Sequence, residues 1–113
     1  DYTTASFSQD DVIAPLNNEY RRFLDNGVCV LFGYAPRNRI ALSPASTVSA
    51  RAELDGWLRQ NLCVPVLGNM EDSLVPGRYL YGTDNHLSTE GVALRTARTA
   101  RELQEYLCQN GLI

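Results

Sequence analysis

Hydrophobic residues recur at helical spacing in three segments of the chain. The first segment runs from about Ser8 to Asn26, the second from Ser46 or Thr47 to about Asn61, and the third from Ser88 to Asn110. The apolar positions are Val12, Ile13, Leu16, Tyr20, Phe23 and Leu24; then Val48, Leu54, Trp57, Leu58 and Leu62; then Val92, Ala93, Ala97, Ala100, Leu103 and Leu107. Spacings of three and four residues place such positions on one face of a helix. The pattern therefore predicts three amphipathic helices, each with its apolar face turned inward.

Residues at the ends of these segments are typical helix signals. Ser8, Ser46 and Ser88 are predicted N-caps, because a serine hydroxyl accepts a hydrogen bond from an otherwise unpaired backbone N–H. Asn26-Gly27 and Asn110-Gly111 are predicted left-handed stops. On the third helix, the pairs Arg98/Glu102 and Arg101/Glu105 have the i,i+4 spacing of exposed ion pairs.

Two short apolar runs between the helices predict β-strands. Val28–Phe32 is rich in β-branched residues and short enough for a strand buried on both faces, and Cys63–Gly68 follows the second helix directly. The order helix, strand, helix, strand, helix predicts an α/β fold: a flavodoxin-like parallel sheet flanked by helices. Arg37–Ala45 and Asn69–Asn85 are predicted loops.

Two strands make a poor independent sheet, so the sequence leaves two alternatives open. Either further strands lie within the loops, with Arg39–Leu42 and Tyr79–Tyr81 as the candidates, or the chain is an incomplete half of a larger doubly wound domain. In the first case residues 1–113 form a single α/β domain. In the second case pairing with a missing N-terminal half, or with a second copy across the edge of the Val28–Phe32 strand, would complete the sheet.

Composition narrows the classes of partner. The chain has 113 residues, 44% of them hydrophobic, which suits one domain with a modest core. Its formal charge is −3, without the basic excess that nucleic-acid binding demands, so nucleic acid is not an expected partner. No apolar run approaches the roughly 20 residues that span a bilayer. Because the sequence does not begin with Met, it is also compatible with a processed or excised piece of a longer protein.

Cysteine and histidine content argues against a metal or cofactor site. Cys29, Cys63 and Cys108 form no CxxC pair, so neither a zinc site nor a disulfide framework is predicted. Cys29 and Cys63 lie in the apolar runs and are expected to be buried packing thiols. The one histidine, His86, excludes a His-rich metal site, and no cofactor is predicted.

His86 is the strongest candidate for chemistry, because it lies at the end of the long loop, two residues before the predicted N-cap Ser88. In a doubly wound fold this is where ligands gather. Carboxylates that could orient the imidazole are Asp84, Glu90 and the Glu71/Asp72 pair. Arg37 and Arg39, after the first strand, are candidates for gripping an anion, although loop arginines are usually solvated.

From about Gly27 onward the chain resembles the C-terminal half of SGNH (GDSL-like) hydrolases, particularly the carbohydrate-modifying members. Leu31–Pro36 and Val64–Asn69 look like two strands of that half. The most specific match is Tyr81–Thr96, with His86-Leu87-Ser88, Gly91 and Leu94-Arg95-Thr96 in order. Together the matching stretches cover about three-quarters of the chain.

The resemblance implies an esterase or acyltransferase segment that acts on an O-acylated carbohydrate, with His86 as general base for a serine nucleophile and an extracytoplasmic location. The family's acid precedes the histidine by three or four residues, where this chain has Thr83 and Gly82, so the resemblance leaves Asp84 to orient the ring. No Gly-Asp-Ser nucleophile block is recognisable, which leaves enzyme activity open.

The alternative function is a non-catalytic α/β module that keeps the SGNH-like scaffold and uses its loops to bind a partner or glycan. Tyr34, Tyr79 and Tyr81 lie on the expected ligand-side loops, where an aromatic ring can stack on a sugar. Packing in the core or at a hinge is the competing expectation for the same three tyrosines.

Overall fold

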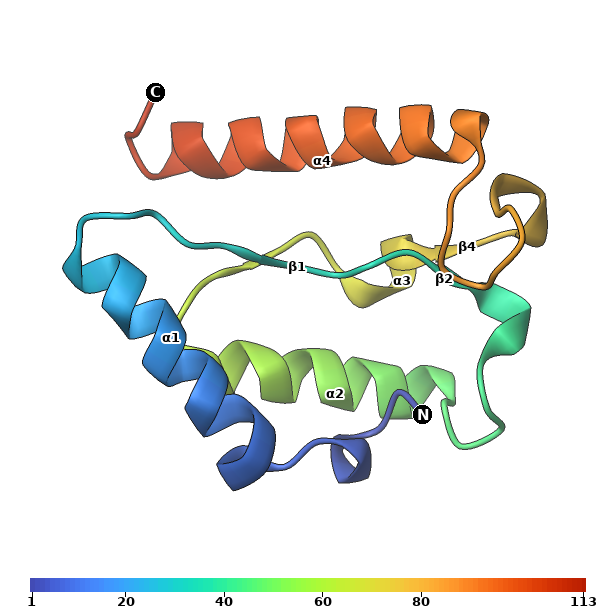
Figure 1. The fold of residues 1–113 in the computed structure, drawn as a ribbon, viewed down its shortest axis with the longest axis horizontal. Coiled ribbons are helices and arrows are strands. Elements are labelled where there is room, and N and C mark those ends of the chain that lie inside the picture. Colours follow the sequence, from blue (N-terminus) through green and yellow to red (C-terminus); the bar gives the residue numbers. More distant parts are fainter. The chain divides into compact units, whose positions relative to one another are not determined.

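A computed structural model describes all of residues 1–113 and contains four α-helices and four two-residue strands (Figure 1). In chain order these are α1 (Ala14–Asp25), β1 (Phe32–Gly33), β2 (Arg37–Asn38), α2 (Val48–Asn61), β3 (Val66–Leu67), α3 (Met70–Ser73), β4 (Leu74–Val75) and α4 (Thr89–Gln109). The strands form two short parallel sheets, one of β1 with β3 and one of β2 with β4. The expected α/β class is therefore confirmed.

The chain divides into two compact units. The first unit comprises Asp1–Gly33 and Leu42–Val66, and the second comprises Tyr34–Ala41 and Leu67–Ile113. The chain passes from the first unit to the second twice, directly after β1 and within β3.

In the first unit, α1 and α2 begin and end close to where the sequence predicts. Ser8 caps a π-helical turn over Gln9–Ile13 that leads into α1, and its hydroxyl accepts a hydrogen bond from the Asp11 N–H at 3.1 Å. Thr47, rather than Ser46, caps α2 by accepting from the Ala50 N–H. Gly27 has φ of 77°, which is the left-handed conformation expected at the end of α1.

The core of the first unit is small and lies between the start of α1 and the inner face of α2. Its buried apolar side chains are Ile13, Leu54, Leu58, Leu62 and Val64. Other members of the predicted apolar faces are not covered: Phe23 is 52% exposed and Val48 is 70% exposed. The second half of α1 thus lacks the cover that its sequence pattern predicts.

The predicted strand Val28–Phe32 is mostly wrong in extent and burial. Only Phe32 and Gly33 form β1, where the Phe32 N–H donates to the Pro65 carbonyl at 2.9 Å, and Val28 is 46% exposed. Cys29, expected to be buried, is exposed, and Cys63 is only half-buried. The reason is that the β1–β3 sheet has just two strands, so nothing flanks this segment on its other edge.

The second unit contains strands where the sequence predicts loops. β2 pairs in parallel with β4, with Arg37 opposite Leu74 and Asn38 opposite Val75. The two stretches expected to supply hidden strands do not: Arg39–Ala41 and Gly77–Tyr79 are 3₁₀ turns, and Leu80 forms only an isolated bridge with Leu87. Two-residue strands have no detectable period, which explains why β2 and β4 escape prediction.

The long helix α4 begins as expected but presents a different face. Ser88 caps it by accepting from the Gly91 N–H, and Asn110-Gly111 ends it. The predicted inward apolar face is largely exposed, with Val92 at 49% and Leu103 at 38%. Polar side chains attach the helix within its unit instead: Arg95 donates to the Tyr34 carbonyl, and Arg98 to the Asp72 carbonyl. The predicted Arg98/Glu102 pair is therefore wrong.

Candidate functional site

The loop that carries His86 is a closed hairpin. The Tyr81 N–H donates to the His86 carbonyl at 2.8 Å, directly after the Leu80–Leu87 bridge. Inside the turn, the Thr83 hydroxyl oxygen accepts from the N–H groups of Asn85 and His86, at 3.3 and 3.1 Å. A threonine is suited to this role because its short side chain folds back onto the next backbone N–H groups. We call residues 81–86 the His86 loop.

The His86 loop is hydrogen-bonded to the end of β2. The Asn38 N–H donates to the Asp84 carbonyl at 2.8 Å, and the Asn38 side-chain amide donates to Asp84 Oδ1 at 2.9 Å. Arg37 adds a bond from its guanidinium to Asn85 Oδ1 at 3.2 Å. Since Asn38 is the last residue of β2, the loop lies at the carboxyl end of a parallel strand, the edge at which α/β folds place ligands.

A shallow, open hollow of about 320 Å³ lies at this junction. It is lined by Asn38, Gly77, Leu80, Gly82, Thr83 and Asp84. The lining is mostly polar and holds no basic side chain. Gly77 lies close to the Asn38 amide, and Gly82 has φ of 72°, a conformation that glycine adopts without strain.

Two side chains of the His86 loop that line the hollow have hydrogen-bonding atoms that are not used within the loop. The Asp84 carboxylate uses one oxygen to accept from Asn38, which leaves Oδ2 as an acceptor. The Thr83 oxygen accepts from two backbone N–H groups, and its own hydroxyl hydrogen remains available as a donor. The hollow thus offers an acceptor and a donor on adjacent residues.

Asp84 and His86, the two residues of the predicted catalytic pair, belong to the same loop but are not hydrogen-bonded to each other through their side chains. His86 is exposed, and only its backbone makes hydrogen bonds. Asp84 is held by Asn38 instead. The pair therefore lacks the acid–imidazole hydrogen bond that would fix the ring's tautomer.

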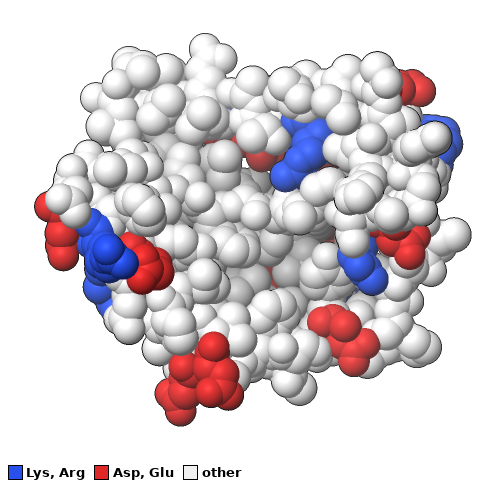
Figure 2. Space-filling model, viewed as in Figure 1, with Lys and Arg blue, Asp and Glu red and all other residues white.

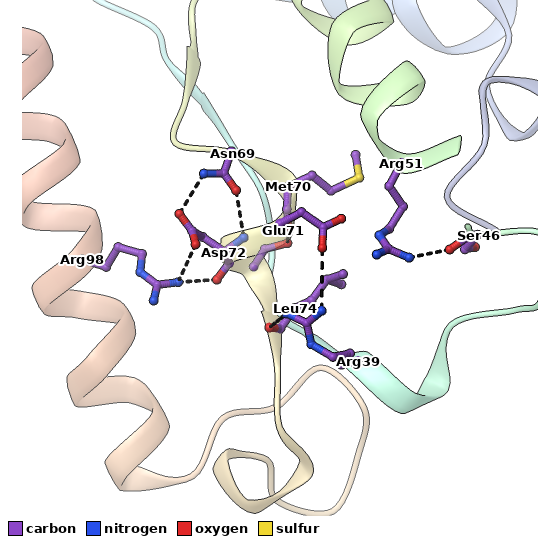
Figure 3. A network of polar contacts seen from close by, with 10 residues as sticks. Arg39, Ser46, Arg51, Asn69, Met70, Glu71, Asp72, Leu74 and Arg98 are labelled. Atoms are coloured by element: carbon purple, nitrogen blue, oxygen red, sulfur yellow. Dashed lines mark hydrogen bonds and ion pairs between the residues drawn. The ribbon is translucent and has the colours of Figure 1, made fainter. Parts of the chain in front are cut away.

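The other carboxylates proposed to orient His86 are engaged elsewhere or lie in the open. Glu71 forms an ion pair with Arg39 at 3.7 Å, and Asp72 with Arg98 at 4.0 Å (Figure 3). Glu90 is exposed in the first turn of α4. No group of three or more histidine, cysteine or acidic side chains is arranged to hold a metal ion.

Figure 3 also shows why Asp72 and Arg39 are structural residues. The Asp72 N–H donates to Oδ1 of Asn69, the N-cap of α3, at 2.9 Å, and the Asp72 carboxylate accepts from the Asn69 side-chain amide at 2.8 Å. Arg39 donates to the Leu74 carbonyl at 3.3 Å in addition to pairing with Glu71. These contacts connect Arg39 to α3 and β4, and Arg37 is bonded to Asn85.

The serines have structural roles as well. Ser88 is a cap, as predicted. Ser46 is not a cap: it is 4% exposed, its hydroxyl accepts from the Tyr2 N–H at 2.8 Å, and its carbonyl accepts from Arg51 at 2.6 Å (Figure 3). Ser46, which the sequence predicts as a helix cap, therefore connects segments of the first unit through its hydrogen bonds.

Of the three candidate tyrosines, Tyr81 is the exposed one. It is 78% exposed and lies in the chain between two residues of the hollow, Leu80 and Gly82. Tyr79 is half-buried beneath the Arg78 guanidinium, which lies 4.7 Å from the ring centre, and the hydrogen bond from Arg78 to the Tyr79 hydroxyl raises the pKa of Arg78. Tyr34 is half-buried, and its carbonyl accepts from Arg95.

Charged side chains form small separate groups of both signs on the face shown in Figure 2. On this face the basic side chains do not gather into a single large patch of the kind that binds phosphates. No helix of the structure combines the length and the apolar character required to cross a membrane.

Sequence reasoning missed Asn38 and Gly77 as lining residues. Asn38 lies in a stretch without period, and its partner Asp84 is 46 residues away, so no local signal connects them. A Pro76-Gly77 turn is visible in the sequence, but its position beside Asn38 depends on the pairing of β2 with β4.

Comparison with known proteins adds no relative: no family model, no curated protein and no solved structure matches the chain.

Proposed function

We propose that the chain is a non-catalytic α/β binding module and that the hollow beside the His86 loop takes a neutral carbohydrate. The observation that carries this proposal is a polar hollow with an acceptor on Asp84 and a donor on Thr83, next in the chain to the exposed Tyr81. Sugars are recognised by such a combination, in which an aromatic face covers the C–H groups and polar side chains bond the hydroxyls.

The charge of the lining defines the kind of sugar. Asp84 is the one ionisable residue of the lining, which contains no arginine. An acidic sugar would bring its own negative charge against this carboxylate, whereas a neutral sugar would donate a hydroxyl hydrogen to it. The site therefore favours neutral over acidic glycans.

Binding to an array of neutral and acidic glycans, followed by calorimetry with the best ligand, tests the proposal. We expect Tyr81→Ala and Asp84→Asn each to weaken binding about tenfold, the effect of losing one stacking contact or one charged hydrogen bond. Asp10→Asn is the matched control, because Asp10 is exposed in the first unit and lies outside the hollow. Equal affinity of all four proteins would contradict the proposal.

A second candidate function is the SGNH-like one, in which the chain is the C-terminal segment of a flavodoxin-like esterase or acyltransferase domain and His86 serves a serine from a missing N-terminal half or a second copy. It is supported by the position of the His86 loop at the carboxyl end of β2 in a parallel pair. The two-stranded sheets and the exposed apolar side chains Phe23, Val28 and Leu103 are also what an incomplete domain would present.

The catalytic candidate is tested with 4-nitrophenyl acetate. If His86 is a catalytic base, hydrolysis by the wild type should exceed that of His86→Ala by more than the contribution of a free imidazole. Because Cys29 and Cys108 are exposed thiols that also react with this ester, the comparison is made in a Cys29→Ser, Cys108→Ser background. Equal rates with and without the imidazole would exclude catalysis by this chain alone or by copies of it.

A further inference from the structure

The helices α1 and α4 end in the same way, at an Asn-Gly pair. Asn26 donates its side-chain amide to the Arg22 carbonyl at 2.7 Å, and Asn110 donates to the Tyr106 carbonyl at 2.8 Å. The glycines that follow have φ of 77° and 67°. Both asparagines are exposed, so water reaches them.

Asn-Gly is chemically the most reactive context for an asparagine side chain. The backbone nitrogen of the glycine attacks the side-chain carbonyl carbon, a C–N bond forms, and the C–Nδ2 bond breaks with release of ammonia. Water then opens the resulting succinimide at either carbonyl and yields aspartate or isoaspartate. The sum is the hydrolysis of one amide by one water molecule.

The observed helix ends hold both pairs in a geometry that cannot react. Ring closure requires the glycine nitrogen to eclipse the asparagine Cβ, whereas ψ of 14° at Asn26 and 9° at Asn110 make it nearly eclipse the asparagine's own nitrogen. The same glycine N–H groups are hydrogen-bonded, to the Leu24 carbonyl at 3.0 Å and to the Cys108 carbonyl at 3.2 Å. Reaction therefore requires the last turn of the helix to open.

We propose that Asn26 and Asn110 are deamidation sites that the folded helix ends suppress, and that their conversion weakens the helix end that carried them. Conversion removes the amide donor that bonds the carbonyl four residues back. It also places a carboxylate at the C-terminal end of a helix, where the helix dipole disfavours negative charge. An opening in which deamidation occurs therefore leaves the helix end permanently changed.

The first test compares native protein with protein held unfolded in urea at the same mildly alkaline pH and temperature. Peptide mapping by mass spectrometry follows the conversion of amide to carboxylate at each site. We expect both sites to react at least about tenfold more slowly in the native protein, because local opening costs free energy. Equal native and unfolded rates at both sites would overturn the proposed suppression.

The second test measures the consequence at α1 by amide hydrogen exchange of Gly27 and Val28, whose N–H groups bond the last carbonyls of the helix. In Asn26→Asp, exchange should be roughly two- to fivefold faster than in the wild type, in proportion to the unfavourable charge at the helix end. Asn26→Gln keeps a neutral amide and is the matched control. Exchange in Asn26→Asp no faster than in Asn26→Gln would overturn the proposed weakening.

Discussion

At the scale of single residues, buried asparagine does more for this structure than any predicted catalytic group. Asn17 is 5% exposed in α1, and its amide donates to the Asn61 carbonyl at 2.7 Å while its oxygen accepts from the Cys63 N–H at 2.8 Å. Asn17 therefore provides hydrogen-bond partners for a backbone carbonyl and a backbone N–H at the C-terminal end of α2. Such a bifunctional contact requires a side chain with both a donor and an acceptor.

Replacing Asn17 tests this role. Asn17→Ala leaves two backbone groups of a half-buried region without partners, so we expect the free energy of unfolding to fall by about 3 kcal/mol. Asn18→Ala, at the exposed neighbouring position, should change it by no more than about 0.5 kcal/mol. Urea unfolding followed by circular dichroism gives both values, and similar losses in the two variants would show that the Asn17 contacts contribute little.

At the scale of elements, the sequence predicts what is local and misses what depends on distant partners. The three long helices are predicted because periodicity, caps and Asn-Gly stops all lie within one segment, as at Ser88 and Gly111. The short β1–β3 sheet forms where the two predicted strands, Val28–Phe32 and Cys63–Gly68, lie, whereas β2 and β4 are missed because they are defined by each other, 37 residues apart from Arg37 to Leu74. For the same reason, the sequence does not reveal that the Asp84 carboxylate accepts a hydrogen bond from Asn38 rather than from His86.

Close contact at the start of α4 gives a prediction at this scale. A Cβ on Gly91 would overlap the Tyr79 carbonyl oxygen and lie 3.1 Å from the Tyr79 Cβ, so the first turn of α4 needs glycine there. Gly91→Ala should lower the free energy of unfolding by about 2 kcal/mol, even though alanine is the better helix former.

Gly56 is the matched control, because it lies within α2 and a Cβ there meets nothing within 4 Å. Gly56→Ala should raise stability by roughly 0.5–1 kcal/mol through helix propensity alone. Thermal or urea unfolding of the two variants distinguishes the cost of steric overlap at position 91 from the gain in helix propensity at position 56. A stabilising effect at both glycines would contradict the close approach of Tyr79 to α4.

At the scale of the whole molecule, the hollow beside the His86 loop brings together groups from distant parts of the sequence. Asn38, Gly77 and Asp84 meet because β2 pairs with β4 and the His86 loop is bonded to the end of β2. Sequence alone identifies the His86 loop and Tyr81 but not the hollow, since the hollow exists only once the strands are paired. The proposed binding function rests on this hollow rather than on His86.

Amide chemical shifts of isotope-labelled protein, recorded during titration with a neutral oligosaccharide chosen from the array, test that function most directly. Binding at the hollow should shift the amides of Gly77, Gly82, Thr83 and Asp84 in a saturable way, and Asp84→Asn should move the titration midpoint to about tenfold higher ligand concentration. Shifts confined to residues of the first unit, or none at saturating ligand, would contradict the assignment of the site.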